Sequence, residues 1–544
     1  MVCLSVIAIL EKKMRGGDVF VGTQGDFQTK PDVVIIGSGV GGSSVALRLA
    51  ATGARILIVE RGEKLPNEPE NADAEAVFVQ SRYRTTDLYR DETGRTYRPG
   101  QYYYVGGHTK FYGTAMFRFR DRDFREVEHE DGVSPAWPVS YADLEPFYTE
   151  AERLFGVRGR AGDDPTEPPR SAPYIHPPVP HEPVIGRVAK GFERLGLSPF
   201  HMPSAIDYGP GGLCRRCGTC DAFVCRFDAK GDAETRLLRP ALKHPNVSLL
   251  TGARVRRLIA DADGKHIAAA EIERAGEITT IEAPLFVLSA GAINSALILL
   301  RSASEQNPNG LANSSGVVGR YLMNHHLSGL MGLLPFTVND TRFPKTVSLN
   351  DFYSGTPGDA AARGNVQMLG NIQGPMIRAA YPWMPGPLAN LLARHSVDFL
   401  VMSEDTQKYD SRVKPLGENG AEVIYRPGDR EAHQRFVRHM RSLLRKNGFP
   451  IVLGHSFGIE APSHQCGTVR MGYDPKEAAL NSFCRAFDHP NLYVVDAGFF
   501  PSSAALNPAL TVAAQALRVG DHIRESRFPS LRGHISSTEN NHAP

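Results

Sequence analysis

Residues 32–62 read DVVIIGSGVGGSSVALRLAATGARILIVERG. Val33 to Ile36 form a short β-branched run, which indicates a strand buried on both faces. A glycine-rich turn follows, then Ser43 to Ala51 has helical spacing, and the apolar run Arg55 to Val59 ends in Glu60. Strand, glycine-rich turn, helix, strand and terminal acid in this order predict one βαβ unit.

The glycines of this turn have separate tasks. Gly37 makes the tight turn, Gly39 lets the backbone approach a pyrophosphate, and Gly42 packs the helix against the strand. Glu60, which follows Gly37 by 23 residues, stands where a carboxylate accepts hydrogen bonds from an adenosine ribose. A glycine-rich turn without a ligand is the alternative, but the complete unit favours a dinucleotide site.

The composition is that of a large globular protein. The 544 residues include 61 Lys and Arg against 59 Asp and Glu, and 42% are apolar, which suffices for a large core and two or more domains. A net charge of +2 offers no basic field, so no nucleic acid partner is expected. Val2 to Leu10 is too short to span a bilayer and lacks the features of a secretory signal. With only seven cysteines, we expect a cytoplasmic protein and no membrane partner.

Later strands are expected to return to the sheet of the opening βαβ unit. They are Leu249 to Ile259, Leu285 to Ser289 before the helix Asn294 to Arg301, and Leu492 to Val495 before Asp496 and the helix Leu510 to Ile523. A second fingerprint, for NAD(P), is absent from the sequence. Both ends of the chain are therefore predicted to build one nucleotide-binding sheet.

Five ordered motifs carry a family resemblance. They are Gly37 to Gly42 with Glu60, Gly106 to Gly113, Ser289 to Gly291, His464 to Gly472, and Asp496 to Leu510. Over nearly its whole length the chain resembles the glucose-methanol-choline (GMC) flavoprotein oxidoreductases. The run Asn507 to Thr511 looks most like the branch of pyranose oxidases and bacterial glycoside oxidases.

The resemblance implies an α/β FAD-binding Rossmann-like domain interleaved with an α+β substrate domain that contains a mostly antiparallel sheet. The expected boundaries are an N-terminal extension over 1–30, the FAD-binding domain over 31–130, 205–302 and 462–525, the substrate domain with its arm over 131–204 and 303–461, and a polar tail over 526–544.

The same resemblance implies bound FAD. Carried over to this chain, the cofactor-binding residues are Gly37, Gly39 and Gly42 at the pyrophosphate, Glu60 at the ribose, Val255 at the adenine, Gly107 and Thr109 near the phosphates and flavin, Asp496 and Ala497 at the ribityl chain, and Asn507 and Pro508 at the flavin. In pyranose oxidases a histidine after the double glycine is bonded covalently to the flavin. Phe111 aligns with it here, and His108 is out of step by three residues, so non-covalent FAD is expected.

Two catalytic residues are expected beside the flavin. Alcohol oxidation needs a base that takes the hydroxyl proton while the carbon gives up a hydride. His464 suits this role, and Asn507 suits the donation of an amide hydrogen to the developing alkoxide. The alternatives are a core histidine at 464 and a turn former before Pro508 at 507. No metal ion is expected in the site.

The expected substrate is a sugar or glycoside whose secondary hydroxyl becomes a ketone, with oxygen or a quinone-type molecule as the electron acceptor. Gln367, Asn371, Gln373 and Tyr381 are candidates for a sugar-binding wall, although a solvated sheet face explains each of them equally well. The strand pattern of Asn365 to Gln373 is expected to pair with Phe399 to Met402 and Glu422 to Arg426. Two other functions stay open: a dehydrogenase of non-sugar alcohols with an iron-sulfur or cytochrome relay, and a non-redox FAD-binding lyase. A homo-oligomer is compatible with the sequence.

Cys214, Cys217, Cys220 and Cys225 have the spacing C-x2-C-x2-C-x4-C, which is close to a ferredoxin-type ligand run. The proline that usually follows the last cysteine is replaced by Arg226. Disulfides, packed thiols, an iron-sulfur cluster and zinc all stay open.

Overall fold

The computed structural model describes residues 30–461 and 464–529. Most of the predicted N-terminal extension, residues 1–29, and residues 530–544 of the predicted tail lie outside this range. The last helix runs to Arg527, past the predicted start of the tail. No helix of the described part is long and apolar enough to cross a bilayer.

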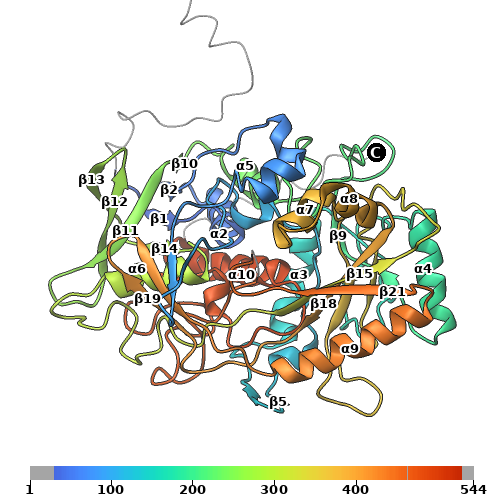
Figure 1. Cartoon of the computed structure of the whole chain (residues 1–544). Helices are drawn as coiled ribbons and strands as arrows, with labels where there is room; N and C mark the ends of the chain where they lie inside the picture. Colours follow the sequence, from blue (N-terminus) through green and yellow to red (C-terminus); the bar gives the residue numbers. More distant parts are fainter. Residues whose placement is uncertain (1–29, 462–463, 530–544) are drawn as a thin grey trace, which may run out of the picture.

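A five-stranded parallel sheet forms the centre of the nucleotide-binding half (Figure 1). Its spatial order is β10 (Val247–Leu250), β2 (Ile56–Val59), β1 (Val33–Ile36), β14 (Phe286–Leu288) and β22 (Leu492–Val494). β1 pairs in parallel with β2 and β14, and β14 pairs with β22. The four residues of β1 are fully buried, as a strand with helices on both sides requires. The prediction of one sheet from both ends of the chain is confirmed.

The run from Leu249 to Ile259 is two strands and not one. β10 ends at Leu250, the chain turns at Gly252 with φ of +62°, and β11 (Ala253–Ala260) enters a second sheet. That sheet is antiparallel and contains β11, β12 (Ile267–Arg274) and β13 (Glu277–Glu282). The prediction was wrong here because apolar periodicity does not register a single turn residue.

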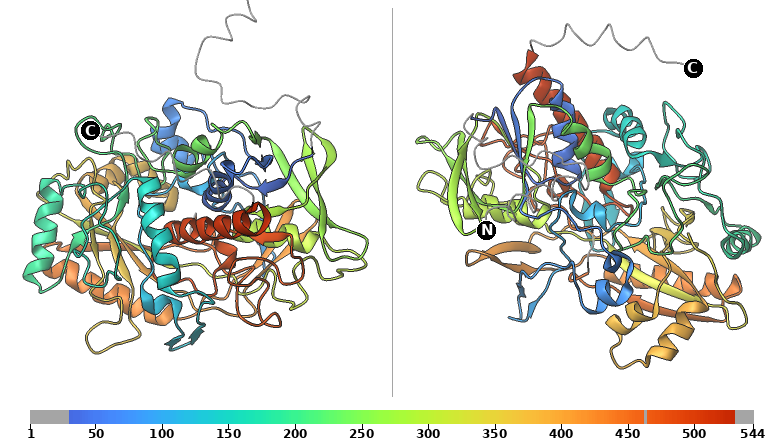
Figure 2. Two further views of the ribbon diagram at one scale, coloured as in Figure 1. Left: turned by 180° about the vertical axis from the view of Figure 1, so that it is seen from behind. Right: turned by 90° about the horizontal axis from the view of Figure 1, so that it is seen from above.

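The helix that follows the glycine-rich turn packs against β1 and β2, and the last helix packs across that helix (Figure 2). α2 (Val40–Ala50) follows the glycine-rich turn, and α10 (Ala509–Arg527) crosses it and also contacts α3 (Tyr141–Phe155). Gly520 of α10 lies against Arg48 of α2. α6 (Ala292–Arg301) follows β14 and also has a buried face.

The other half is built on a six-stranded sheet. Its order is β21 (Ile451–Ser456), β15 (His326–Leu333), β18 (Ser396–Ser403), β17 (Asn365–Met368), β16 (Val347–Leu349) and β8 (Phe200–His201). A separate hydrophobic core joins this sheet to α4 (Pro183–Arg194) and α9 (Arg430–Lys446). The adjacent antiparallel strands confirm the predicted pairing of the segment from Asn365 with Phe399 to Met402.

Two details of that prediction were wrong. Glu422 belongs to β20 (Gly420–Ile424), which lies in a different sheet with β19 (Arg412–Leu416), β3 (Tyr89–Asp91) and β4 (Thr96–Tyr97). β17 ends at Met368, and the chain passes into the helix pair α7 (Gly374–Ala380) and α8 (Gly386–Arg394). Asn365 and Gln367 are buried and do not form a solvated face.

The remaining elements are short. They are the hairpin β5 (Val127–His129) with β6 (Gly132–Ser134), the pair β7 (Val157–Arg158) with β9 (Ser204–Ala205), and α5 (Arg239–Ala241).

Candidate active site

One cavity of about 640 Å³ lies at the carboxyl ends of the parallel strands and reaches the six-stranded sheet. Residues that follow β1, β2, β14 and β22 line it: Gly37, Glu60, Ser289 and Asp496. This edge is the usual ligand position of an open parallel sheet.

The glycine-rich turn forms one wall of the cavity. Gly37 has φ of +101°, and a Cβ there would lie 2.2 Å from the carbonyl oxygen of Ser289. A Cβ on Gly39 would meet no atom within 4 Å, so the backbone at Gly39 is open to a ligand. A Cβ on Gly42 would lie 2.1 Å from the carbonyl oxygen of Gly37, which confirms that this glycine allows close packing of α2 on the turn. Gly41, for which no role was predicted, allows an equally close approach to the carbonyl oxygen of Val495.

Glu60 lies at the end of β2 and is 6% exposed. Its carboxylate accepts hydrogen bonds from the backbone N–H and hydroxyl of Ser38 and from the N–H of Gly62. Burial raises the pKa of Glu60, and these hydrogen bonds oppose the rise. The groove beside it lies at the N-terminus of α2, where the helix dipole favours negative charge such as that of a pyrophosphate.

Seven more of the predicted cofactor residues line the same cavity: Gly107, Thr109, Val255, Asp496, Ala497, Asn507 and Pro508, whereas Gly42 packs against Gly37 and is not among the lining residues. The carboxylate of Asp496 accepts hydrogen bonds from the N–H groups of Gly291 and Gly498 and from the hydroxyl of Ser295. This long groove, with its open glycines and buried carboxylates, fits an extended dinucleotide.

Phe111 and His108 both line the cavity. The ring of Phe111 stacks on Tyr102 at 4.1 Å between centroids, and a phenyl ring has no atom that bonds covalently to a flavin. Nε2 of His108 accepts a hydrogen bond from the N–H of Tyr102, and burial lowers the pKa of His108 to about 4.

His464 reaches the cavity from a segment that pairs with the residues just before β15. Met323 and Cys466 form an antiparallel bridge, and in that register residues 325 and 464 stand opposite each other. Nδ1 of His464 lies 2.7 Å from Nδ1 of His325, and Nε2 of His325 lies 2.8 Å from the carbonyl oxygen of Ser503.

These contacts determine the tautomer of His464. The carbonyl of Ser503 only accepts, so Nε2 of His325 carries the hydrogen and its Nδ1 is an acceptor. His464 then donates from Nδ1, which leaves the lone pair of its Nε2 free. Burial, and then the charges of His325, Lys345 and His108, lower the pKa of His464 well below its usual range. His464 is therefore a neutral imidazole whose acceptor nitrogen, Nε2, has no hydrogen-bond partner among residues 30–461 and 464–529.

Asn507 lies just before α10 and is oriented by a buried glutamine. Nε2 of Gln367 donates to Oδ1 of Asn507 at 2.9 Å, and also to Oδ1 of Asn365 at 3.0 Å. Because Oδ1 of Asn507 is thereby occupied, its Nδ2 group is free to donate. Oε1 of Gln367 has no hydrogen-bond partner among the described residues.

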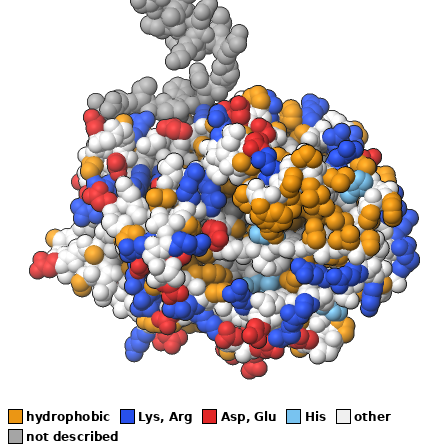
Figure 3. All heavy atoms as spheres, in the orientation of Figure 1, with side chains coloured by type: hydrophobic (Ala, Val, Ile, Leu, Met, Phe, Trp, Pro, Cys, Tyr) orange, Lys and Arg blue, Asp and Glu red, His pale blue; other side chains and the backbone are white. Residues whose placement is uncertain are grey.

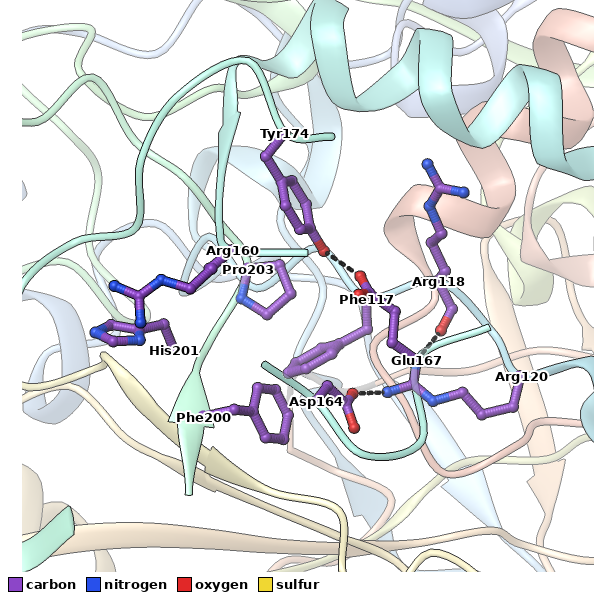
Figure 4. Close-up of a pocket in the computed structure, with 10 residues that line it drawn as sticks. All are labelled: Phe117, Arg118, Arg120, Arg160, Asp164, Glu167, Tyr174, Phe200, His201 and Pro203. Carbon is purple, nitrogen blue, oxygen red and sulfur yellow. Dashed lines mark hydrogen bonds and ion pairs between the residues drawn. The ribbon is translucent and has the colours of Figure 1, made fainter. Parts of the chain in front are cut away.

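A carboxylate at one end of a row of hydrogen-bonded amide side chains determines how each amide is oriented. Nδ2 of Asn365 donates to Oδ1 of Asn350, and Nδ2 of Asn350 donates to Asp164, both at 2.8 Å. Asp164 also contacts Arg120 beside a small cavity of about 10 Å³ (Figure 4). An ionised carboxylate only accepts, so each amide in the row from Asp164 to Asn507 has one favoured orientation.

The wall of the cavity on the side of the six-stranded sheet is mainly apolar. It contains Leu327, Leu369, Ile372, Met376, Leu400 and Phe457. None of the four residues expected to bind a sugar is among the lining residues that the structure describes. Asn371 donates to the carbonyl of Thr341, and Tyr381 contacts His455. The expectation of a polar wall was wrong because the polar side chains of this segment are used in internal hydrogen bonds.

One ion pair lies at the end of the cavity near His464. Nζ of Lys345 lies 2.7 Å from Oδ2 of Asp221, and both residues line the cavity. Burial raises the pKa of Asp221, but the charge of Lys345 and its hydrogen bonds outweigh it, so the pKa is lowered. The carboxylate is therefore ionised and neutralised by its partner.

The four cysteines of the 214–225 loop are free thiols in the described structure. Cys214, Cys220 and Cys225 pack against a small apolar cluster that includes Phe343. Three or more ligands of one metal ion have their ligand atoms close together. Among the described residues, only Asp261, Asp263 and His266 have three such atoms within 4.8 Å of one another, and the cysteines do not. The thiols are therefore not gathered as closely as ligands of one zinc ion, and a cluster remains a prediction.

Sequence reasoning missed His325 and the orienting role of Gln367. The adjacent pair His325-His326 was a visible signal, but only the strand register shows which histidine contacts His464. Gln367 was noted for its polarity and given a sugar-binding role.

Comparisons with known proteins agree on one family. GMC oxidoreductase models match residues 93–327 and 420–516, and an FAD binding domain matches residues 32–79. A 6‴-hydroxyparomomycin C oxidase of Streptomyces lividus is 32% identical, with 93% of each chain covered. A paromamine 6′-oxidase of Streptomyces fradiae is also 32% identical, with 90% of each chain covered. A pyridoxine 4-oxidase from Mesorbium loti has a similar fold, with a TM-score of 0.61, 19% identity, and coverage of 91% of this chain and 99% of that chain.

Proposed function

The chain belongs to the GMC oxidoreductase family, an FAD-dependent family that acts on alcohol groups, and from this premise we propose that it oxidises a hydroxyl of a sugar or glycoside. The observation that carries the proposal is the pairing of a free acceptor nitrogen on His464 with a free amide donor on Asn507 at one cavity.

FAD supplies the hydride acceptor when bound. Gly37, Gly39 and Gly107 would hold its pyrophosphate region, Glu60 its ribose, and Asp496 its ribityl chain. Phe111, in the position of the covalent histidine of pyranose oxidases, leaves the cofactor non-covalently bound.

His464 and Asn507 act on the substrate oxygen. Nε2 of His464 takes the hydroxyl proton, since its other nitrogen already donates to His325. Nδ2 of Asn507 donates to the same oxygen as negative charge develops there, and the N-terminus of α10 adds a favourable dipole. The apolar wall excludes water and strengthens both interactions.

The lining narrows the substrate class. Among the described lining residues at the end of the cavity near His464, the carboxylate is that of Asp221. It is already paired with Lys345 and is not available to a cationic substrate. A polycationic sugar needs carboxylates free to pair with its ammonium groups. The apolar wall instead favours a neutral glycoside with an apolar face or aglycone.

Two kinds of substrate hydroxyl are candidates for oxidation, a secondary ring hydroxyl and a primary hydroxyl. The likeness of Asn507 to Thr511 to the pyranose oxidase branch supports a secondary ring hydroxyl that becomes a ketone. The names of two relatives, which specify 6′ and 6‴ positions, support a primary hydroxyl that becomes an aldehyde. Electrons pass to oxygen or a quinone-type acceptor.

A substrate panel with product analysis tests the proposal. Aryl and alkyl glycosides, free sugars, aminoglycosides, and aliphatic and aryl alcohols are compared with oxygen and with an artificial quinone. We expect the highest kcat/KM with neutral glycosides of apolar aglycones. Turnover confined to non-sugar alcohols would refute the sugar assignment, and absence of flavin reduction by every alcohol would leave the lyase alternative.

A further inference from the structure

The ion pair of Lys345 and Asp221 keeps unused hydrogen-bonding capacity inside the cavity. Oδ2 of Asp221 accepts from Nζ of Lys345 at 2.7 Å and from the N–H of Gly370 at 3.2 Å. Within residues 30–461 and 464–529, Oδ1 of Asp221 accepts no hydrogen bond, and Asp221 is the one acceptor of the Lys345 ammonium. An ammonium group has three hydrogens to donate. Both side chains line the cavity, so a donor and an acceptor remain for a ligand there.

Two glycines hold this pair in place. A Cβ on Gly113 would lie 2.3 Å from Nζ of Lys345 and 2.4 Å from Oδ1 of Asp221. A Cβ on Gly370 would lie 2.6 Å from Cβ of Asp221. Both glycines line the cavity as well, and the side chain of Lys345 is only 6% exposed. The pair is therefore packed into one position by the surrounding backbone before any ligand binds.

The cysteine loop, residues 214–225, carries Asp221 to the cavity. Three of its thiols pack against the cluster that contains Phe343, which lies close in the chain to Lys345. The loop and the segment before β16 are thus joined by apolar contacts, and each contributes one member of the ion pair. The cysteines have a packing role here whether or not they bind a metal.

A buried lysine fixes the other side of this loop. Lys230 has no exposed surface, and its Nζ donates to the carbonyl oxygens of Phe223 and Tyr112 at 2.6 and 2.8 Å. Phe223 belongs to the cysteine loop, and Tyr112 precedes Gly113 in the chain. This bridge keeps the loop that carries Asp221 beside the glycine on which the ion pair packs.

The pair lies on the substrate side of the cavity. Lys345 comes just before β16 and Gly370 follows β17, and both strands belong to the six-stranded sheet. Burial is the main reason that the pKa of His464 is lowered, and the charge of Lys345 adds to it. Lys345 is therefore close enough to the reacting end for His464 to experience its charge.

The surroundings of the pair are apolar. Ala379 and Ala380 of α7 line the cavity and are exposed, so the cavity reaches the surface there. Figure 3 shows hydrophobic side chains gathered over α7 and α8. A hydroxyl group that enters past this surface and the apolar wall gives up hydrogen bonds to water, and it needs polar partners inside.

We propose that Lys345 and Asp221 bind a second hydroxyl of the sugar, apart from the one that is oxidised. The oxygen of this hydroxyl accepts from Nζ of Lys345, and its hydrogen is donated to Oδ1 of Asp221. The pair has no net charge, so it suits a neutral hydroxyl better than an ammonium or a carboxylate group. This assignment rests on the proposed function, and it makes the substrate a polyhydroxylated ring rather than a simple alcohol.

Phenyl β-glucoside and its 2-, 3-, 4- and 6-deoxy analogues test the assignment. The FAD-loaded enzyme is assayed by flavin reduction at about pH 8, where a histidine of ordinary pKa is neutral. The analogue that lacks the oxidised hydroxyl does not react. One of the others should lose about 10- to 100-fold in kcat/KM, the size of a hydrogen bond to a charged group. In Lys345→Met/Asp221→Asn the parent glucoside should lose a similar factor, and its advantage over that analogue should nearly vanish.

Two further variants separate the hydroxyl contact from folding. Gly113→Ala keeps both charges but displaces them, and it should weaken the preference for the same hydroxyl. Lys408→Met is the matched control, because Lys408 forms an ion pair of 2.7 Å with Asp131 outside the described cavity lining. Flavin content and melting temperature report folding. Dissociation constants from the flavin absorbance of His464→Ala give a readout that needs no turnover.

The outcomes distinguish this assignment from the proposed function. Equal losses for the parent glucoside and every reactive analogue in Lys345→Met/Asp221→Asn would overturn the hydroxyl contact and leave glycoside oxidation in place. Turnover confined to non-sugar alcohols, with glucoside binding that still depends on one hydroxyl and on the ion pair, would refute the proposed function alone. A glucoside that is neither bound nor oxidised would overturn both.

Discussion

Gln367→Glu is the substitution that tests most directly how Asn507 is oriented. Gln367 donates to Oδ1 of Asn507, and this leaves Nδ2 of Asn507 for the substrate oxygen. An ionised carboxylate at position 367 only accepts. It would draw Nδ2 of Asn507 toward itself and turn Oδ1 toward the developing alkoxide.

The expected loss has the size of a missing oxyanion donor. Removing such a donor costs about 10² to 10³ in kcat, and the reversed amide places a repulsive oxygen there as well. Gln367→Met removes the donor but leaves the amide free to take either orientation. The loss in that variant should be about fivefold, which corresponds to a net hydrogen bond of about 1 kcal/mol.

The pH dependence separates orientation from packing. Burial raises the pKa of a carboxyl group, and the protonated acid can again donate its hydrogen to Asn507. The activity of Gln367→Glu should therefore recover as the pH falls, relative to wild type at the same pH, while that of Gln367→Met should not.

Anaerobic stopped-flow reduction of the flavin at saturating substrate provides the assay. Gln373→Glu is the control, because it makes the same change six residues along the chain at a side chain outside the cavity lining. Flavin content and melting temperature report folding. Equal losses of the flavin-reduction rate in Gln367→Glu and Gln367→Met at every pH would refute the orientation argument. Wild-type rates in both variants would show that Asn507 does not contribute to the reaction.

Four further predictions concern His464, the flavin linkage and a buried carboxyl group. His464→Ala should retain FAD and lose about 10² or more in kcat; near wild-type turnover would mean that another group takes the proton. The acidic limb of the kcat/KM profile should lie below pH 6.5, because the lowered pKa keeps His464 neutral in moderate acid; a limb at or above 6.5 contradicts this. Acid precipitation should release all flavin into the supernatant, whereas flavin retained in the pellet would disprove the inference from Phe111. Burial raises the pKa of Asp398 to about 7, so the free energy of unfolding should fall by up to about 4 kcal/mol between about pH 4 and 7, and Asp398→Asn should flatten this decline in urea titrations.

The nucleotide half was predictable because its signals are local. Gly37, Gly39 and Glu60 lie within one βαβ unit, where Gly37 is required by its close approach to Ser289 and Gly39 leaves the backbone open to the cavity. Strand β22, more than 400 residues later, was recognised by its apolar run and by Asp496. In the substrate half, β20 was assigned to the wrong sheet because its partner β3 lies far away in the chain, and pairing over such distances leaves no periodic signal.

The site was predictable where a residue belongs to a motif. His464 and Asn507 stand in ordered segments, and the structure places both at the cavity. His325 depends on a strand register, and Gln367 on the burial of a polar strand face. Neither property follows from residue type, since a glutamine on an alternating strand has the same pattern whether water or protein covers it.

The two predicted catalytic groups have opposite hydrogen-bonding roles although both orienting chains begin at an acceptor. From the carbonyl of Ser503, each imidazole accepts at one nitrogen and donates at the other, so the chain ends in a free acceptor at Nε2 of His464. From Asp164, successive amides also donate in one direction until Gln367, whose two Nε2 hydrogens serve Asn365 and Asn507 together. That double donation inverts the direction and leaves a free donor on Asn507. An alcohol that is losing a proton needs one acceptor and one donor at its oxygen, and the inversion at Gln367 is what allows one buried site to supply both.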